Sequence, residues 1–205
     1  MVYKISVTKK KIGISLSEHV GVDPEVDYEL GVFFGSKLDE LTEAGRNKIM
    51  TLSSKNHIFA WSLGHGAGLK FKKNSFEIRN WILVFADKSP YFSGGLGHGL
   101  SRHIRKLATS NSLEPIMEFA EEHPVFAFDL AYELGYYFGA FSEKIKEKIC
   151  HIATKNDQFA FRMGEAIGGI YEDLESKDKE FVMGFTGKNK YFSKGFSKSS
   201  HKKEL

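Results

Sequence analysis

Aromatic and histidine side chains recur at matching places in this sequence, and they are the residues best suited to a binding surface. Trp61, Phe128 and Phe161 each stand two residues after the start of a similar segment, and other rings follow four residues later. Tyr, Trp and Arg dominate protein interfaces, whereas Lys, Glu and Ser are usual at exposed helix positions. The pattern predicts a groove that binds a peptide or protein segment; the alternative is that a second packing face buries these rings. The expected groove residues are Trp61, His65, His98, Arg102, Phe128, Tyr132, Tyr136, Phe161 and Glu165.

A second set of residues could bind an acidic partner. The net charge is only +3, but Lys70, Lys72, Lys73, Arg105 and Lys106 follow two adjacent segments that we expect to stack. Clustered cations raise the local potential, so a nucleic-acid or ribosome-associated protein that also uses the basic C-terminal tail is the rival function. Because four glutamates lie close by in sequence between residues 114 and 122, a charge-balanced, solvated face is the plainer interpretation.

We expect neither catalysis nor a bound cofactor. The sequence has no nucleophile elbow and no convincing carboxylate pair, and Cys150 stands alone without a plausible base. His65 and His98 are too few for a metal site, which usually needs three or four ligands. The single thiol and the lack of an apolar signal-peptide core in residues 1–21 favour a cytoplasmic protein.

The elements that position these residues form an internal repeat. Similar segments begin at residues 22, 59, 92, 126, 159 and 192, a period close to one helical hairpin. We count the first residue of each segment as place 0. Apolar or small residues then occupy places 0, 1, 4, 5, 8, 9 and 12, which is typical of an amphipathic helix with a wide buried face. Longer matches, YELGVFFG at Tyr28 with YELGYYFG at Tyr132 and KSPYFSGG at Lys88 with KNKYFSKG at Lys188, suggest duplication of a block of several hairpins.

Small residues recur at places 5 and 9, as in Gly64 and Gly68 or Gly164 and Gly168. Each glycine costs about 1 kcal/mol relative to alanine inside a helix, so the repetition indicates close packing of neighbouring helices. No apolar stretch reaches the roughly 18 residues of a membrane span. A phosphate-binding glycine loop is the alternative, but such loops join a strand to a helix.

A second helix precedes each of these segments, with an aliphatic residue ten places before the start: Ile49, Ile82, Ile116, Ile149 or Val182. Asn56 and Asn156 are expected as left-handed C-caps of that helix, and Pro90 and Pro124 as its stops. The sequence therefore predicts an all-α solenoid of five hairpins with a C-terminal capping helix over residues 22–205; a compact α-bundle is the alternative. Residues 1–21 are expected to form a separate extension or cap, either a β-hairpin or a helix starting near Ser17.

The pairs Leu63-Gly64, Leu96-Gly97 and Met163-Gly164, in repeats near 34 residues, resemble the tetratricopeptide class and its Sel1-like relatives. The aromatic residue of that motif is replaced by Ala67, Leu100 and Ile167, so a separate helical-repeat family is the alternative. The resemblance implies a concave surface that binds proteins and carries out no chemistry.

Overall fold

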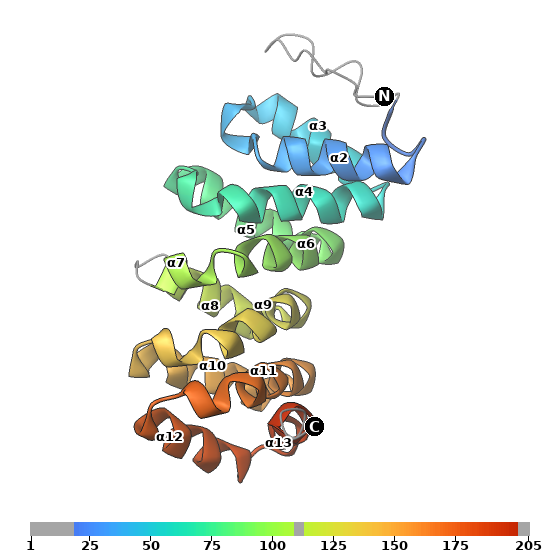
Figure 1. Cartoon of the computed structure of the whole chain (residues 1–205). Coiled ribbons are helices and arrows are strands. Elements are labelled where there is room, and N and C mark those ends of the chain that lie inside the picture. The colour runs from blue at the N-terminus through green and yellow to red at the C-terminus, as the bar shows by residue number, and fades with distance from the viewer. Residues whose placement is uncertain (1–18, 109–112, 201–205) are drawn as a thin grey trace. The chain divides into compact units, whose positions relative to one another are not determined.

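Every regular element in the described part of the structure is a helix. The computed structural model describes residues 19–108 and 113–200, and these ranges contain α- and 3-10 helices but no strand (Figure 1). The predicted all-α class is confirmed, and the extension or cap predicted for residues 1–21 lies almost wholly outside the described residues. The helices are α2 (Pro24–Gly35), α3 (Glu43–Ser53), α4 (His57–Lys70), α5 (Phe76–Lys88), α6 (Pro90–Ser101), α7 (Ile104–Ala108), α8 (Leu113–Glu122), α9 (Pro124–Tyr136), α10 (Glu143–Lys155), α11 (Asp157–Ile170), α12 (Ser176–Thr186) and α13 (Lys190–Ser200).

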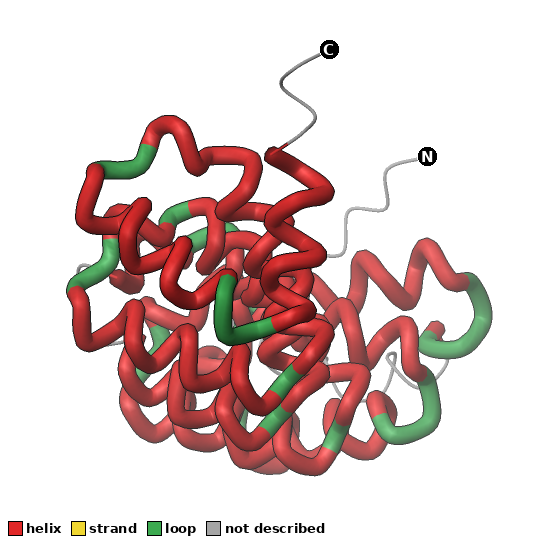
Figure 2. Tube along the Cα trace, turned by 90° about the horizontal axis from the view of Figure 1, so that it is seen from below, coloured by secondary structure: helices red, strands yellow, loops and turns green. Residues whose placement is uncertain are grey.

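The chain divides into two compact units, residues 1–99 and 100–205. In the first unit α2, α4 and α6 lie side by side, with α3 and α5 in a second layer (Figure 1). In the second unit α9, α11 and α13 form the corresponding row, and α8, α10 and α12 the second layer. Short loops join successive helices (Figure 2). Each unit is thus built from helical hairpins, and we call α2, α4, α6, α9, α11 and α13 the row helices.

The starts of the row helices differ from the sequence prediction. Asn56 has an extended backbone, and its Oδ1 accepts a hydrogen bond of 2.9 Å from the Phe59 amide; Asn156 does the same for Phe159 at 3.0 Å. These residues are therefore N-caps of the following helix and not left-handed C-caps of the preceding one. Pro124 occupies the first turn of α9, where proline loses no intrahelical hydrogen bond, and α8 ends two residues before it at Glu122, as the sequence predicted. Pro90 begins α6 in the same way.

Glycine contacts fix the spacing of the row helices. A Cβ atom on Gly64 of α4 would lie 2.0 Å from the backbone oxygen of Phe92, and one on Gly95 of α6 would lie 1.8 Å from that of Trp61. Both helices therefore need glycine where they cross, and the close packing predicted from places 5 and 9 is confirmed. The sequence prediction missed Gly95, which belongs to the complementary ridge on the facing helix.

The second unit repeats these contacts 100 residues further along the chain. A Cβ on Gly164 of α11 would lie 2.3 Å from the Phe192 oxygen, and one on Gly195 of α13 would lie 2.0 Å from the Phe161 oxygen. The pairs Gly64 with Phe92 and Gly164 with Phe192 are thus equivalent. The two units have matching internal packing, as duplication of a multi-hairpin block would produce.

This correspondence changes the register of the first repeat. Cβ atoms on Gly31 and Gly35 of α2 would lie 2.8 Å and 2.0 Å from the backbone oxygens of Phe59 and Leu63, as Gly164 and Gly168 relate to Phe192 and Phe196 in the second unit. The helix position held by Phe59 in α4 is therefore held in α2 by Val26, four residues after the Val22 that the sequence pattern suggested. The pattern was ambiguous because apolar residues fit both registers. Tyr28 consequently matches Trp61.

The second-layer helices bury the aliphatic stripe that the sequence indicated. Ile82, Ile116 and Ile149 are fully buried, and Ile49 and Val182 are nearly so. In the second unit Lys146 of α10 and Asp178 of α12 form an ion pair inside this layer, where each side chain is almost inaccessible to solvent. Within the described residues, no helix combines the length and the apolar character that a membrane crossing requires.

Candidate binding surfaces

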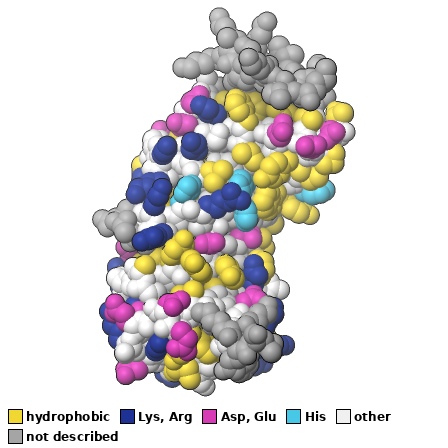
Figure 3. Space-filling model, viewed as in Figure 1, with side chains coloured by type: hydrophobic (Ala, Val, Ile, Leu, Met, Phe, Trp, Pro, Cys, Tyr) yellow, Lys and Arg dark blue, Asp and Glu magenta, His cyan; other side chains and the backbone are white. Residues whose placement is uncertain are grey.

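Four aromatic or imidazole rings lie close together on the first unit, at places 2 and 6 of the segments carried by the row helices. The centroid of Trp61 lies 6.2 Å from that of Tyr28, 5.5 Å from that of His65 and 5.3 Å from that of His98. The two imidazole centroids are 5.0 Å apart. His65 is buried, Trp61 and His98 are half-buried, and Tyr28 is exposed. Hydrophobic and histidine side chains lie close together in the upper half of the molecule in Figure 3.

The glycine contacts of α4 and α6 explain why these rings meet. A Cβ on Gly99 would lie 2.3 Å from the backbone oxygen of His65, so α6 approaches α4 closely one turn after the contact between Gly95 and Trp61. His65 and His98 occupy the same place in successive repeats, and parallel helices at this short distance bring their rings into contact. His65 and His98, both expected in the groove, therefore contact each other. No group of three or more metal-ligating side chains occurs in the described part of the chain.

The corresponding surface of the second unit combines aromatic rings with charges. The guanidinium carbon of Arg162 in α11 lies 5.4 Å from the ring centroid of Phe128 and 5.5 Å from that of Tyr132, both in α9. On the other side of α11, Lys198 of α13 forms an ion pair of 2.8 Å with Glu165. Of the predicted groove residues, Phe128, Tyr132 and Glu165 thus lie around Arg162, a residue that the sequence analysis missed. A cation one place after the Phe161 ring is the signal that could have indicated it.

A surface pocket of about 410 Å³ opens on this unit. Its walls are mainly apolar, with the rings of Phe128, Phe161 and Tyr191 contributed by α9, α11 and α13. Arg162 lines the same pocket, as do Asp157 and Gln158 from the first turn of α11. Pockets of this size and character suit an apolar group held by a few polar contacts.

Two predicted groove residues are exposed and do not line the pocket of the second unit. Tyr136 is exposed at the end of α9, and its ring packs edge-on against that of Tyr137 at a centroid distance of 5.0 Å. Arg102 is exposed in the turn that follows α6. Neither residue lines the pocket of the second unit.

The residues of the predicted basic patch are exposed, but they belong to different units. Lys70 ends α4, and Lys72 and Lys73 lie in the 3-10 helix Phe71–Lys73 of the first unit. Arg105 and Lys106 are in α7 of the second unit. Their convergence remains a prediction from the repeat pattern.

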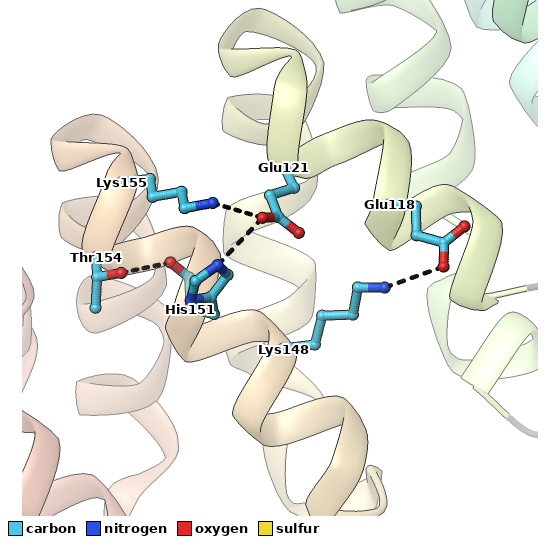
Figure 4. A network of polar contacts seen from close by, with 6 residues as sticks. All are labelled: Glu118, Glu121, Lys148, His151, Thr154 and Lys155. Carbon is cyan, nitrogen blue, oxygen red and sulfur yellow. Dashed lines mark hydrogen bonds and ion pairs between the residues drawn. The ribbon is translucent and has the colours of Figure 1, made fainter.

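Three of the four glutamates near this patch in sequence pair with residues of α10. Lys148 lies 3.4 Å from Glu118, and Lys155 lies 2.5 Å from Glu121, which also accepts from His151 (Figure 4). The hydrogen bond from Lys155 and the one from His151 hold the pKa of Glu121 below its usual value. Exposed pairs of this kind contribute little to stability, although they connect α8 to α10. Glu114 and Lys144 make a third such pair at 2.7 Å.

Burial raises the pKa of Asp129, Glu133 and Cys150 in the second unit. Burial raises the pKa of Asp129 to about 6, although the Arg162 charge opposes the shift. Burial also raises the pKa of Glu133, one turn further along α9. The pKa of the buried Cys150 thiol rises to about 12 for the same reason, so this cysteine has none of the thiolate character of a catalytic nucleophile.

Comparison with models of protein families, with curated proteins and with solved structures finds no match. The geometry of the two surfaces is therefore the basis for any functional interpretation.

Proposed function

We propose that this protein is a cytoplasmic helical-repeat solenoid that binds a peptide or protein segment through the aromatic side chains of its row helices. The observation that carries the proposal is the open apolar pocket of the second unit, walled by Phe128, Phe161 and Tyr191. Rings exposed around a pocket give large contact area with little conformational entropy to lose, which is the character of interface hot spots.

The first unit supports the same interpretation. Tyr28 and Trp61 take the places that Phe128 and Phe161 take in the second unit, and their rings stack at 6.2 Å. Both copies of the duplicated block therefore present aromatic side chains at equivalent places. Since these side chains are incompletely buried, packing alone does not account for the choice of residue.

A peptide selection tests this function. Twelve-residue peptides displayed from a random library are selected on the immobilised full chain, and the best are synthesised and titrated against variants in solution. We expect Tyr191→Ala and Phe161→Ala to weaken binding by about tenfold or more, as loss of a hot-spot ring does. Met183→Ala and Phe76→Ala, which alter exposed side chains on second-layer helices, serve as controls and leave affinity unchanged.

Salt separates this function from its rival. Affinity that depends on rings changes little between 50 and 200 mM salt, whereas binding of labelled single-stranded RNA through several phosphates falls by orders of magnitude. If no peptide binds while RNA binds in a salt-sensitive manner that Lys72→Gln and Lys73→Gln weaken, the peptide-binding function is refuted in favour of nucleic-acid binding.

A further inference from the structure

The two copies of the duplicated block differ at one place beside the pocket. In the first unit this place belongs to Ser62, whose buried hydroxyl donates to the backbone oxygen of Ile58 at 2.9 Å. In the second unit the equivalent residue, 100 positions later, is Arg162, which lines the pocket. A small, internally satisfied side chain is thus replaced by a cation that faces the candidate ligand site.

The guanidinium of Arg162 has unused hydrogen-bonding capacity. Its Nη1 is 3.5 Å from Glu165 Oε2, longer than the roughly 2.7–2.9 Å of a charge-assisted hydrogen bond. Glu165 pairs more closely with Lys198, at 2.8 Å through its other oxygen. The Nε atom of Arg162 is buried and finds no hydrogen-bond partner among residues 19–108 and 113–200. The Arg162 side chain as a whole is 42% exposed and lines the pocket, so a ligand can supply acceptors to its guanidinium.

Arg162 is also held in place. The rings of Phe128 and Tyr132 lie 5.4 Å and 5.5 Å from its guanidinium carbon, which is within the range of cation–π attraction. Asp129 forms no ion pair with Arg162 in the described structure, although the two charges attract each other at longer range. A planar guanidinium oriented in this way is suited to bind a carboxylate with two parallel hydrogen bonds.

The rest of the pocket limits the ligand further. Phe128, Phe161 and Tyr191 offer an apolar wall beside Arg162, so the ligand needs an apolar side chain adjacent to its acidic group. Asp157 lines the same pocket and would repel a second negative charge, which disfavours a polyanion such as a nucleic-acid backbone.

We propose that the pocket of the second unit binds a peptide segment in which a bulky apolar side chain stands next to a carboxylate, and that Arg162 binds the carboxylate. This inference rests on the proposed peptide-binding function and specifies its ligand. The first unit, with Ser62 in place of Arg162, has no such preference.

The test uses an array of nine-residue peptides in which every pair of residues is placed within a Gly/Ser background. The array is probed with the full chain, and selected pairs are titrated in solution. We expect the strongest pairs to join Phe, Tyr, Trp, Leu or Met to Asp or Glu. Replacing the acid by its amide weakens binding to the wild type about tenfold or more, as loss of a charge-assisted bidentate contact predicts.

Variants then assign the effect to Arg162. Arg162→Gln binds both the acidic and the amide peptide weakly and no longer distinguishes them, whereas Arg162→Lys retains part of the preference because it keeps the charge but loses the fork. Lys188→Gln removes an exposed cation that does not line the pocket and is the matched control. Circular dichroism confirms that each variant is folded.

The two proposals fail in different ways. Peptides that require Phe161 and Tyr191 but show no preference for an acid, or an acid preference that Arg162→Gln leaves intact, overturn the assignment to Arg162 and leave the peptide-binding function standing. If no peptide distinguishes the wild type from Tyr191→Ala, both proposals are overturned.

Discussion

The packing of the row helices predicts opposite effects for two glycine substitutions in a single helix. Gly164 and Gly169 both lie in α11, so alanine at either place improves intrinsic helix propensity by about 0.5–1 kcal/mol. A Cβ on Gly169 has no atom within 4 Å in the described structure, whereas a Cβ on Gly164 would lie 2.3 Å from the Phe192 oxygen. Only Gly164 therefore meets a backbone that cannot rotate away.

The magnitude follows from the distance. Ordinary contact of a Cβ begins near 3.4 Å, so α11 and α13 must separate by about 1 Å to accept Gly164→Ala. Overpacking of this kind costs about 1–3 kcal/mol and outweighs the gain in propensity. We therefore expect Gly169→Ala to raise the free energy of unfolding by about 0.5–1 kcal/mol and Gly164→Ala to lower it.

Urea denaturation followed by circular dichroism at equal protein concentration measures both changes. Gly184→Ala in α12, where a Cβ also has nothing within 4 Å in the described residues, is a second control that should behave like Gly169→Ala. A Gly164→Ala protein as stable as Gly169→Ala would refute the close approach of α11 and α13.

Three further predictions concern buried groups of the second unit. Because burial raises the pKa of Asp129 to about 6, its contribution to stability is fully present below its unfolded pKa and is lost as pH rises through 6. Asp129→Asn should therefore gain in melting temperature relative to the wild type between pH 4.5 and 7.5; a constant difference contradicts this. Lys146→Met leaves the buried Asp178 unpaired and should lower the free energy of unfolding by about 3–5 kcal/mol, measured by urea denaturation. The double variant Lys146→Met with Asp178→Leu should recover most of this loss, and a negligible effect of Lys146→Met alone would argue against burial of the pair. Cys150, whose pKa burial raises to about 12, should react with a disulfide reagent at pH 8 only after unfolding, and rapid labelling of the native protein would count against its burial.

Much of the candidate surface could be predicted because helix periodicity assigns each residue to a face. Trp61, His65 and His98 were placed together from their repeat positions, and the structure confirms that their rings are in contact. Tyr136 and Arg102 had equivalent positions, but Tyr136 lies at the end of α9 and Arg102 in the turn after α6, where the chain turns away. Periodicity indicates which face of a helix carries a residue, but it does not show where the neighbouring helices end.

The sequence by itself determined the helices and the glycine ridge, since each depends on residue types at fixed spacing along one chain. The tertiary structure alone decided the register of the first repeat, through the contact of Gly35 with the Leu63 backbone. It alone also identified Arg162, whose environment is made by Phe128 and Tyr132 of another helix. The register of the first repeat and the surroundings of Arg162 both depend on which surfaces of separate helices meet. A pattern within one helix does not show how the neighbouring helix is shifted along it.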